Sequence, residues 1–247
     1  MKMGWRAAVL AGVGALASWC SGAQAYRPFD GTDAAVTAPG EVEIEFAPAE
    51  YLRDGAARTL FAPHSVFNYG VAPGWEAVVE GQISHGLSGG TGGTSLANNS
   101  ASLKSVLREG ALQEKTGPSI ATEFGVLLPG IRADRGTGAN LAGILSEQWP
   151  WATVHLNASA SLTRQQHADL FLGAIVEGPL DWPVRPVTEL FGERDFGRTK
   201  VRSALIGVIW QAKEDVAVDF GVRGARVNDH IAGEIRVGIT FSAALPR

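Results

Sequence analysis

The stretch ATVHLNASASL, residues 152–162, alternates between two kinds of residue. Valine, leucine and alanine occupy the even positions from 154 onward, and threonine, histidine, asparagine and serine occupy the odd positions. Successive side chains of a β-strand point to opposite faces, so this stretch predicts a strand with one apolar and one polar face. Residues 75–83, 216–223 and 231–241 show the same alternation.

Weaker alternating segments fill most of the remaining chain. They lie near residues 41–49, 59–69, 101–108, 118–128, 140–148, 170–177, 187–192 and 200–211. Beyond the first 25 residues, no segment has about 18 consecutive apolar residues, and no long stretch keeps apolar residues at helical spacing. The sequence therefore predicts an all-β fold, a single antiparallel transmembrane β-barrel of about 12 strands.

The expected connections alternate in length. Longer ones are expected near residues 50–58, 84–100, 129–139, 163–169, 193–199 and 226–230, and shorter ones near 70–74, 109–117, 149–151, 178–186 and 212–215. Long loops at one end and short turns at the other are typical of outer-membrane barrels. Two of the short connections are not very short, so the rule is only partly met.

Tryptophan placement favours a membrane barrel. Five tryptophans follow residue 25, and each lies within or beside an expected short connection: Trp75, Trp149, Trp151, Trp182 and Trp210. Indole rings prefer the membrane–water boundary, so we expect these five residues to form an interface girdle at one end of the barrel. The alternative is that they cap the core of a soluble protein.

The N-terminus has the pattern of a secretory signal peptide over residues 1–25. Lys2 and Arg6 precede an apolar stretch, and Ala23-Gln24-Ala25 provides the small residues of a cleavage site. Cleavage would leave residues 26–247 as the barrel domain. The single cysteine, Cys20, follows the bulky Trp19, which disfavours a lipoprotein.

Charge and cysteine content exclude several functions of the mature chain. Removing Lys2 and Arg6 leaves 19 basic and 25 acidic groups, a net charge of −6, with no cysteine. This excludes disulfides and thiol chemistry and disfavours a nucleic-acid partner recruited by bulk positive charge. The expected partners are outer-membrane lipid and an unidentified small molecule.

If the apolar faces meet lipid, the charged residues of the opposite faces converge in the lumen. The lumen-facing candidates are Glu43, Glu80, Glu123, Glu177, Glu189, Arg202, Asp219, Arg223, Glu234 and Arg236. Such charges must pair or be hydrated. Two interpretations compete: a closed network of ion pairs and hydrogen bonds, or a polar and mostly acidic conduit.

Enzymatic and metal chemistry find little support in the sequence. Three histidines lie near serines, as His64 with Ser65, His85 with Ser84, and His155 with Ser159. The side chains of His155 and Ser159 share the polar face, but they are roughly 13 Å apart along the strand, too far for a direct hydrogen bond. We therefore expect no catalytic residue. The five histidines show no close pairing, so no metal site and no cofactor are expected.

Short motifs along the mature chain match a known family. They begin with Arg27-Pro28-Phe29, Asp33-Ala34 and residues 39–45 (PGEVEIE), and continue through residues 67–71 (FNYGV), 75–81 (WEAVVEG), 117–121 (GPSIA), 128–129 (LP) and 155–157 (HLN). In these motifs the chain resembles the bacterial outer-membrane family named for a putative meta-pathway of phenol degradation, and this resemblance covers nearly the whole mature chain. It implies an outer-membrane barrel and, loosely, uptake of aromatic or hydrophobic compounds. One departure is that Ser242 to Arg247 follow Phe241, whereas many outer-membrane barrels end on an aromatic residue.

The sequence thus predicts passive transport of a small, unidentified molecule. The family resemblance implies that this molecule is aromatic or hydrophobic. A closed structural barrel without flux is the first alternative. The second is a lipid-modifying membrane enzyme, which would require a nucleophile and a base on neighbouring strands.

Overall fold

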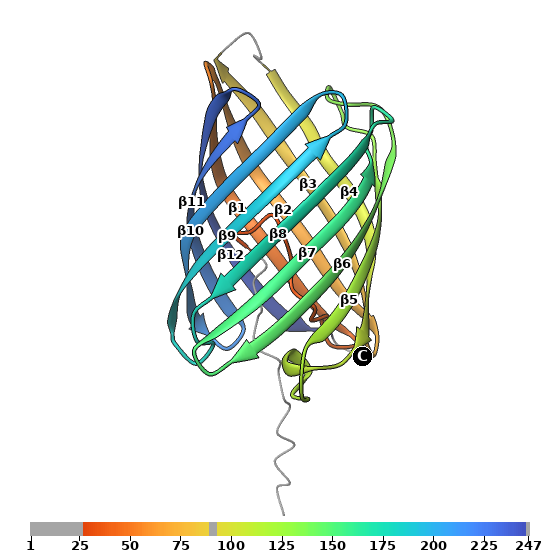
Figure 1. Cartoon of the computed structure of the whole chain (residues 1–247), viewed down its shortest axis with the longest axis vertical. Coiled ribbons are helices and arrows are strands. Elements are labelled where there is room, and N and C mark those ends of the chain that lie inside the picture. The colour runs from red at the N-terminus through yellow and green to blue at the C-terminus, as the bar shows by residue number, and fades with distance from the viewer. Residues whose placement is uncertain (1–26, 89–92, 246–247) are drawn as a thin grey trace, which may run out of the picture.

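Twelve antiparallel strands form a closed barrel in the computed structural model, which describes residues 27–88 and 93–245 (Figure 1). Each strand pairs with its sequence neighbours, and β1 pairs with β12 to close the sheet. The fold class predicted from the alternation is confirmed. The predicted signal peptide lies outside the described residues.

Most strands are longer than the alternating segments that predicted them. The strands are β1 (Glu41–Asp54), β2 (Ala57–Ala72), β3 (Trp75–Ser88), β4 (Gly93–Arg108), β5 (Ser119–Leu127), β6 (Gly138–Trp149), β7 (Ala152–Leu162), β8 (Ala168–Glu177), β9 (Val184–Asp195), β10 (Thr199–Lys213), β11 (Val216–Val227) and β12 (His230–Ala244). Polar pairs such as Arg53 and Arg58 continue the β1–β2 ladder beyond the apolar part of the strands. Backbone hydrogen bonding between strands therefore extends beyond the residues that show the apolar alternation.

The predicted asymmetry of connection lengths is wrong. The expected long connections near 50–58 and 226–230 are the tight turns 55–56 and 228–229, where Gly55 and Asn228 adopt positive φ angles of 59° and 50°. Residues that tolerate this conformation allow the strands to pair up to the turn. Longer connections occur at both ends, over 109–118 and 128–137.

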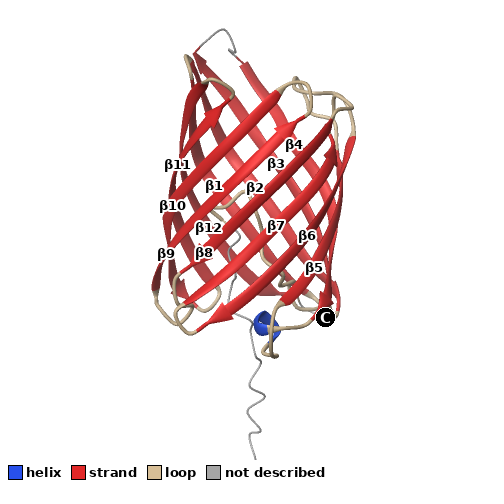
Figure 2. Cartoon of the chain, in the orientation of Figure 1, coloured by secondary structure: helices blue, strands red, loops and turns tan. Residues whose placement is uncertain are grey.

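The 109–118 connection contains a short 3₁₀ helix, η1 (Ala111–Gln113), at the lower end of the barrel in Figure 2. Within residues 27–88 and 93–245, no helix has the length and apolar character needed to cross a membrane. The described chain is otherwise strands, turns and one extended segment inside the barrel (Figure 2).

The two faces of the sheet differ as the alternation predicted. On β7, Leu156 is exposed on the outer face, whereas His155 and Asn157 are buried on the inner face. On β10, Ile206 is 69% exposed while its neighbour Leu205 is 1% exposed. An exposed apolar band around a polar interior is the arrangement of a transmembrane barrel.

Residues 27–39, here called the luminal segment, run inside the barrel before β1 begins (Figures 1 and 2). Phe29 packs against a small apolar cluster of Val187, Ile209 and Ala217 on β9, β10 and β11. Ala34 packs on a second cluster that includes Ile144 of β6. The core of the protein is therefore the contact between this segment and the inner wall.

Glycines of the wall make room for the luminal segment. A Cβ at Gly238 would lie 2.3 Å from Asp219 Oδ2 and 2.4 Å from Arg27 Nε. A Cβ at Gly70 would lie 2.0 Å from the Ala38 carbonyl oxygen, at the point where the segment turns into β1. Both distances are shorter than any normal contact, so these positions fit the segment only as glycine.

Candidate functional site: the luminal segment and the cavity beside it

Side chains of the barrel wall accept hydrogen bonds from the backbone of the luminal segment. The bonds run from Asp30 N and Gly31 N to Glu189 (2.9 and 2.7 Å), from Thr32 N to Asn157 Oδ1 (3.0 Å), from Ala34 N to Ser146 Oγ (2.9 Å) and from Thr37 N to Glu76 Oε2 (2.6 Å). These bonds replace the ladder that an extended segment inside a barrel lacks. Carboxylate acceptors are the stronger ones.

Ion pairs fasten the same segment to the wall. Arg27 pairs with Glu50 and lies 3.7 Å from Asp219, Asp30 lies 3.2 Å from Arg223 and 3.0 Å from Arg236, and Asp33 lies 3.5 Å from Lys104. Arg236 also donates to the Pro28 carbonyl oxygen at 2.7 Å. The segment contributes one cation and two carboxylates, and the wall contributes an oppositely charged partner for each. Each partner therefore neutralises a charge that would otherwise be unpaired in the lumen.

A buried chain of hydrogen bonds supports the anchor at Ala34. Its N–H donates to Ser146 Oγ, and Ser146 Oγ lies 2.8 Å from His155 Nδ1. His155 Nε2 lies 3.1 Å from Glu177, which also receives a 2.8 Å bond from Arg185. Because an ionised Glu177 can only accept, the imidazole proton lies on Nε2 facing it, and Nδ1 of a neutral ring then accepts from the Ser146 hydroxyl.

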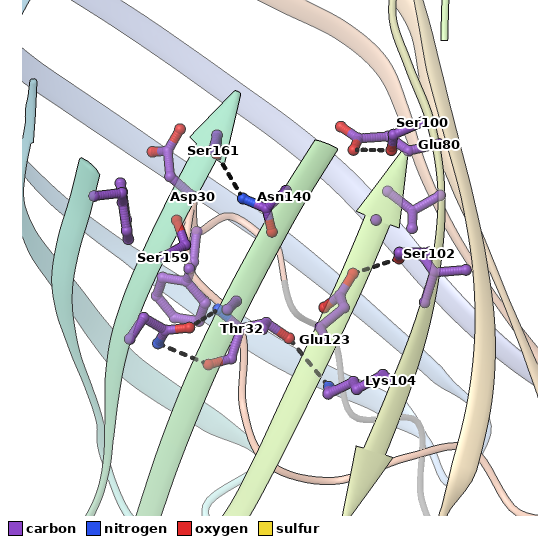
Figure 3. Close-up of a pocket in the computed structure, with 18 of the residues that line it drawn as sticks. Asp30, Thr32, Glu80, Ser100, Ser102, Lys104, Glu123, Asn140, Ser159 and Ser161 are labelled. Atoms are coloured by element: carbon purple, nitrogen blue, oxygen red, sulfur yellow. Dashed lines mark hydrogen bonds between the residues drawn. The ribbon is translucent and has the colours of Figure 1, made fainter. Parts of the chain in front are cut away.

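A cavity of about 440 Å³ lies beside the luminal segment. Its wall comes mainly from β2 to β9, and residues 29–32 of the segment form part of its lining. Figure 3 shows Lys104 and Thr32 low in this space and Ser161, Ser100 and Glu80 above them. Several lining residues stand at the upper ends of their strands, such as Leu127, Asn140 and Ser161, so the cavity extends toward the upper end of the barrel.

The cavity lining is acidic. Two fixed cations, Arg27 and Lys104, and one histidine, His64, line it against seven carboxylates: Asp30, Glu45, Glu76, Glu80, Glu123, Asp169 and Glu193. Hydroxyl and amide groups fill much of the remaining polar wall, for example Ser102, which donates to Glu123, and Ser100, which donates to Glu80 at 3.3 Å (Figure 3). The space therefore repels anions and attracts cations.

Nine of the ten lumen-facing candidates lie on the inner face. Glu80, Glu123 and Glu189 border the cavity or the segment, and Asp219, Arg223, Glu234 and Arg236 form the ion pairs around Arg27 and Asp30. Glu43 and Glu177 lie lower, where Glu43 accepts from Ser242 at 2.9 Å and Glu177 from Arg185. The wall thus gathers these charges around the luminal segment.

Arg202 is the exception, and its predicted lumen-facing position is wrong. It is exposed on the same face of β10 as Ala204 and Ile206, whereas Ser203 and Leu205 occupy the inner face. Arg202 lies three residues from the upper end of β10, where an outward arginine reaches past the apolar band. The alternation of 200–211 gave no reliable phase, because Ser203, Ala204 and Gly207 weaken it.

Several residues that shape the lumen were missed by the sequence analysis. They are Arg27, Asp30, Asp33, Glu45, Glu50, Glu76, Lys104 and Glu193. Glu76 and Lys104 are directly opposite each other on β3 and β4, and both fall on the polar face of their strands. Alternation alone would have found them. No periodic signal precedes residue 40, so nothing in the pattern indicated that the luminal segment enters the barrel.

The five tryptophans are exposed at the lower end of the barrel. Trp75 begins β3, Trp149 ends β6, Trp210 lies near the end of β10, and Trp151 and Trp182 lie in the connections that follow β6 and β8. The rings of Trp149 and Trp151 stack with centroids 5.8 Å apart. Exposed indoles at one height are the arrangement that a membrane interface favours.

No group of three histidine, cysteine or acidic side chains is arranged to hold a metal ion within residues 27–88 and 93–245. The carboxylates of the cavity are distributed along the wall instead of converging on one point. Hydroxyl, amide and carboxylate groups are the main polar contacts that this wall offers to a molecule in the cavity.

The sequence matches no family model and no curated protein. Solved outer-membrane barrels do resemble its structure. The COG4313 outer membrane channel from Pseudomonas putida F1 has a TM-score of 0.62 at 8% identity, covering 85% of this chain and 97% of that one. The KdgM porin has a TM-score of 0.54 at 10% identity, and the NanC porin 0.54 at 9%, each covering 81% of this chain and 98% of its own. The chain therefore has the fold of an outer-membrane β-barrel.

Proposed function

We propose that this protein lies in the bacterial outer membrane, after export with a cleaved signal peptide, and mediates passive uptake of small polar molecules through its lumen. The observation that carries the proposal is the cavity of about 440 Å³ beside the luminal segment, a volume suited to a small ligand. Its lining of hydroxyl, amide and carboxylate groups offers exchangeable hydrogen bonds to a solute in transit.

The luminal segment controls this path in our proposal. It crosses the lumen below the cavity, and its anchors stand on β1, β3, β6, β7, β9, β11 and β12. Flux then requires the segment to shift. Cleavage after Ala25 would make it the free end of the mature chain, so it could leave the lumen without straining β1.

The resemblance to the phenol meta-pathway family implies a hydrophobic or aromatic solute, but the acidic cavity favours a polar one. The KdgM porin has been solved in complex with disordered oligogalacturonate, an anionic sugar. Seven carboxylates in the cavity of this chain argue against an anion of that kind. We therefore propose that its solute differs in charge from the ligand of that porin.

Liposome swelling tests the proposal. Purified full-length protein should admit small neutral sugars slowly, and a variant lacking residues 28–37 should admit them much faster. A shift in gel migration on heating should show that both proteins are folded barrels. Absence of swelling for both folded proteins would contradict uptake and leave a closed structural barrel.

A serine hydrolase is a second candidate, favoured by one observation. Ser146, His155 and Glu177 lie on the neighbouring strands β6, β7 and β8 in hydrogen-bond contact, as a nucleophile, a base and its orienting acid would. Ser146, however, is 0% exposed and accepts the N–H of Ala34. Labelling of Ser146 by a fluorophosphonate in the variant lacking residues 28–37 would support this activity, and absence of labelling would confine the three residues to anchoring.

A further inference from the structure

We infer that the luminal cavity is a binding site for an elongated organic diamine, held by carboxylates at separate places along the cavity wall. The inference rests on the proposed uptake function and names its substrate class. It follows from three features of the cavity: carboxylates that lack cationic partners, a buried carboxylate oxygen at its floor, and apolar side chains between the acidic groups.

The upper carboxylates of the cavity have few partners. Glu123 accepts a hydrogen bond from the Ser102 hydroxyl, and Asp169 has a buried Oδ2 atom with no hydrogen-bond partner in the described chain. No ion pair within 4.0 Å joins Glu193 to another described residue. The next inward-facing residue of β9, Asp195, is also acidic. Partly buried like charges repel one another and are poorly hydrated, so a cation entering the cavity relieves both costs.

The floor of the cavity provides a second and independent indication of a ligand. Glu76 is 0% exposed, and its Oε2 atom accepts hydrogen bonds from the backbone N–H and the hydroxyl of Thr37, both at 2.6 Å. Its Oε1 atom is buried and has no hydrogen-bond partner in the described part of the chain. Glu76 lines the cavity, so this oxygen is an acceptor available to a donor that reaches the floor.

The spacing of the acidic groups selects the shape of the ligand. Glu76 and Glu80 lie on the same face of β3 with Val78 between them, and their Cα atoms are roughly 13 Å apart along the strand. Glu80 itself is held by His64 at 3.0 Å, so the open acceptors are those of Glu123, which is paired in register with Lys104 of β4 and lies between the heights of Lys104 and Glu80 in Figure 3. A chain with an ammonium group at each end reaches both levels.

The side chains between the acidic levels suit the hydrocarbon part of such a molecule. Val78, Leu127 and Phe171 line the cavity together with the hydroxyls of Ser102 and Ser159. The aromatic face of Phe171 also attracts a neighbouring ammonium group. An ammonium group has three donors and no acceptor, which matches a wall of carboxylate and hydroxyl oxygens. A metal ion would need these ligands to converge, and within the described residues they do not.

Titration calorimetry of the folded protein in detergent, with 1,5-diaminopentane as the probe, tests the assignment. The diamine should bind, glutarate should not, and pentylamine should bind about tenfold more weakly because it loses one charged contact. Glu123→Gln and Glu193→Gln should each raise the Kd of the diamine about tenfold. Glu214→Gln is the matched control, since Glu214 is exposed in the β10–β11 turn at the opposite end.

Three results would overturn the inference: no binding of the diamine, binding of glutarate or of calcium chloride more tightly than the diamine, or a diamine Kd that is unchanged from the unsubstituted protein in both glutamine variants. Swelling measurements separate this from the proposed function. Sugar uptake without diamine binding would contradict only the assignment of the cavity as a diamine site. Diamine binding by a barrel that admits no solute in any variant would contradict the proposed uptake function and leave the cavity as a closed binding site.

Discussion

The two sides of the lumen are built from the same alternating strands and yet differ in what fills them. On the β9–β12 side, Arg223 and Arg236 stand among Asp30, Asp219 and Glu234, and the luminal segment occupies the space. On the β3–β5 side, the carboxylates Glu80 and Glu123 face an open cavity. The segment reaches the β3–β5 side only lower down, where Asp33 pairs with Lys104. The difference teaches that the polar contacts of the segment decide which side of the lumen is filled, while alternation decides only which side chains face inward.

Breaking the filled side should have the largest effect. Arg236→Met removes one of the two arginines that Asp30 and Glu234 share, leaving Arg223 alone with both, and removes the bond to the Pro28 carbonyl oxygen. Loss of one member of a buried ion-pair group should lower the free energy of unfolding by about 3 kcal/mol. Denaturant unfolding in lipid vesicles measures it. The control is Arg202→Met on the outer rim of β10, with an effect near zero, and equal losses in both variants would refute the anchoring role of Arg236.

The lipid-facing surfaces of the two sides should respond alike. Val237 on β12 is 39% exposed and Val79 on β3 is 54% exposed, and both point outward. Val237→Arg and Val79→Arg should each cost about 2 to 4 kcal/mol in vesicles, because an arginine is placed against hydrocarbon. Normal folding of Val237→Arg in vesicles, with improved insertion of Arg236→Leu, would show that the inner and outer faces have been exchanged.

The anchor at Ala34 should be weaker than the ion pairs. Ser146→Ala removes the acceptor of the Ala34 N–H and the donor to His155, which leaves two buried groups unsatisfied. We expect a loss of about 2 kcal/mol in unfolding free energy. Ser159→Ala, facing the cavity on β7, should change it by less than about 0.5 kcal/mol. A Ser159 variant as unstable as the Ser146 variant would mean that the cavity side is as tightly held as the filled side.

A matched pair of carboxylates gives the smallest expected effect. Glu189 accepts the N–H groups of Asp30 and Gly31, whereas Glu123 accepts only the Ser102 hydroxyl among the described partners. Glu189→Gln should cost about 1 kcal/mol, since the amide keeps only one acceptor oxygen for two N–H groups that bind separate carboxylate oxygens. Glu123→Gln should leave the unfolding free energy within about 0.5 kcal/mol of the wild type. The reverse order in denaturant midpoints would invert the comparison between the two sides.

The barrel could be predicted from the sequence because apolar and polar residues alternate regularly in strands such as β7 and β12. A lipid-facing position tolerates only apolar residues, so the period-two pattern is strong there. Where alanine, glycine and serine dilute it, as in 200–211, the phase was lost and Arg202 was assigned to the wrong face. The turn lengths failed for a related reason, since polar residues at the strand ends keep pairing beyond the membrane.

The position of the luminal segment could not have been predicted from the same signals. Arg27 and Asp30 contact strands more than a hundred residues away and Asp33 contacts Lys104, and an extended chain held by side chains has no periodicity of its own. Their partners were partly found, because Glu189, Asp219 and Arg236 lie on clearly alternating faces. The acidic character of the lumen was therefore predicted, and its division into a filled and an open side was not.

The central claim is that flux requires the luminal segment to move, and a reversible crosslink tests it most directly. Ala34 N lies 2.9 Å from Ser146 Oγ, so the two residues are neighbours, and the double variant Ala34→Cys, Ser146→Cys is oxidised to join them, a disulfide that mass spectrometry verifies. The only native cysteine, Cys20, lies in the predicted signal peptide. Swelling of liposomes is measured before and after reduction. We expect no sugar uptake in the oxidised protein and restored uptake after reduction. Equal uptake in both states would contradict the claim.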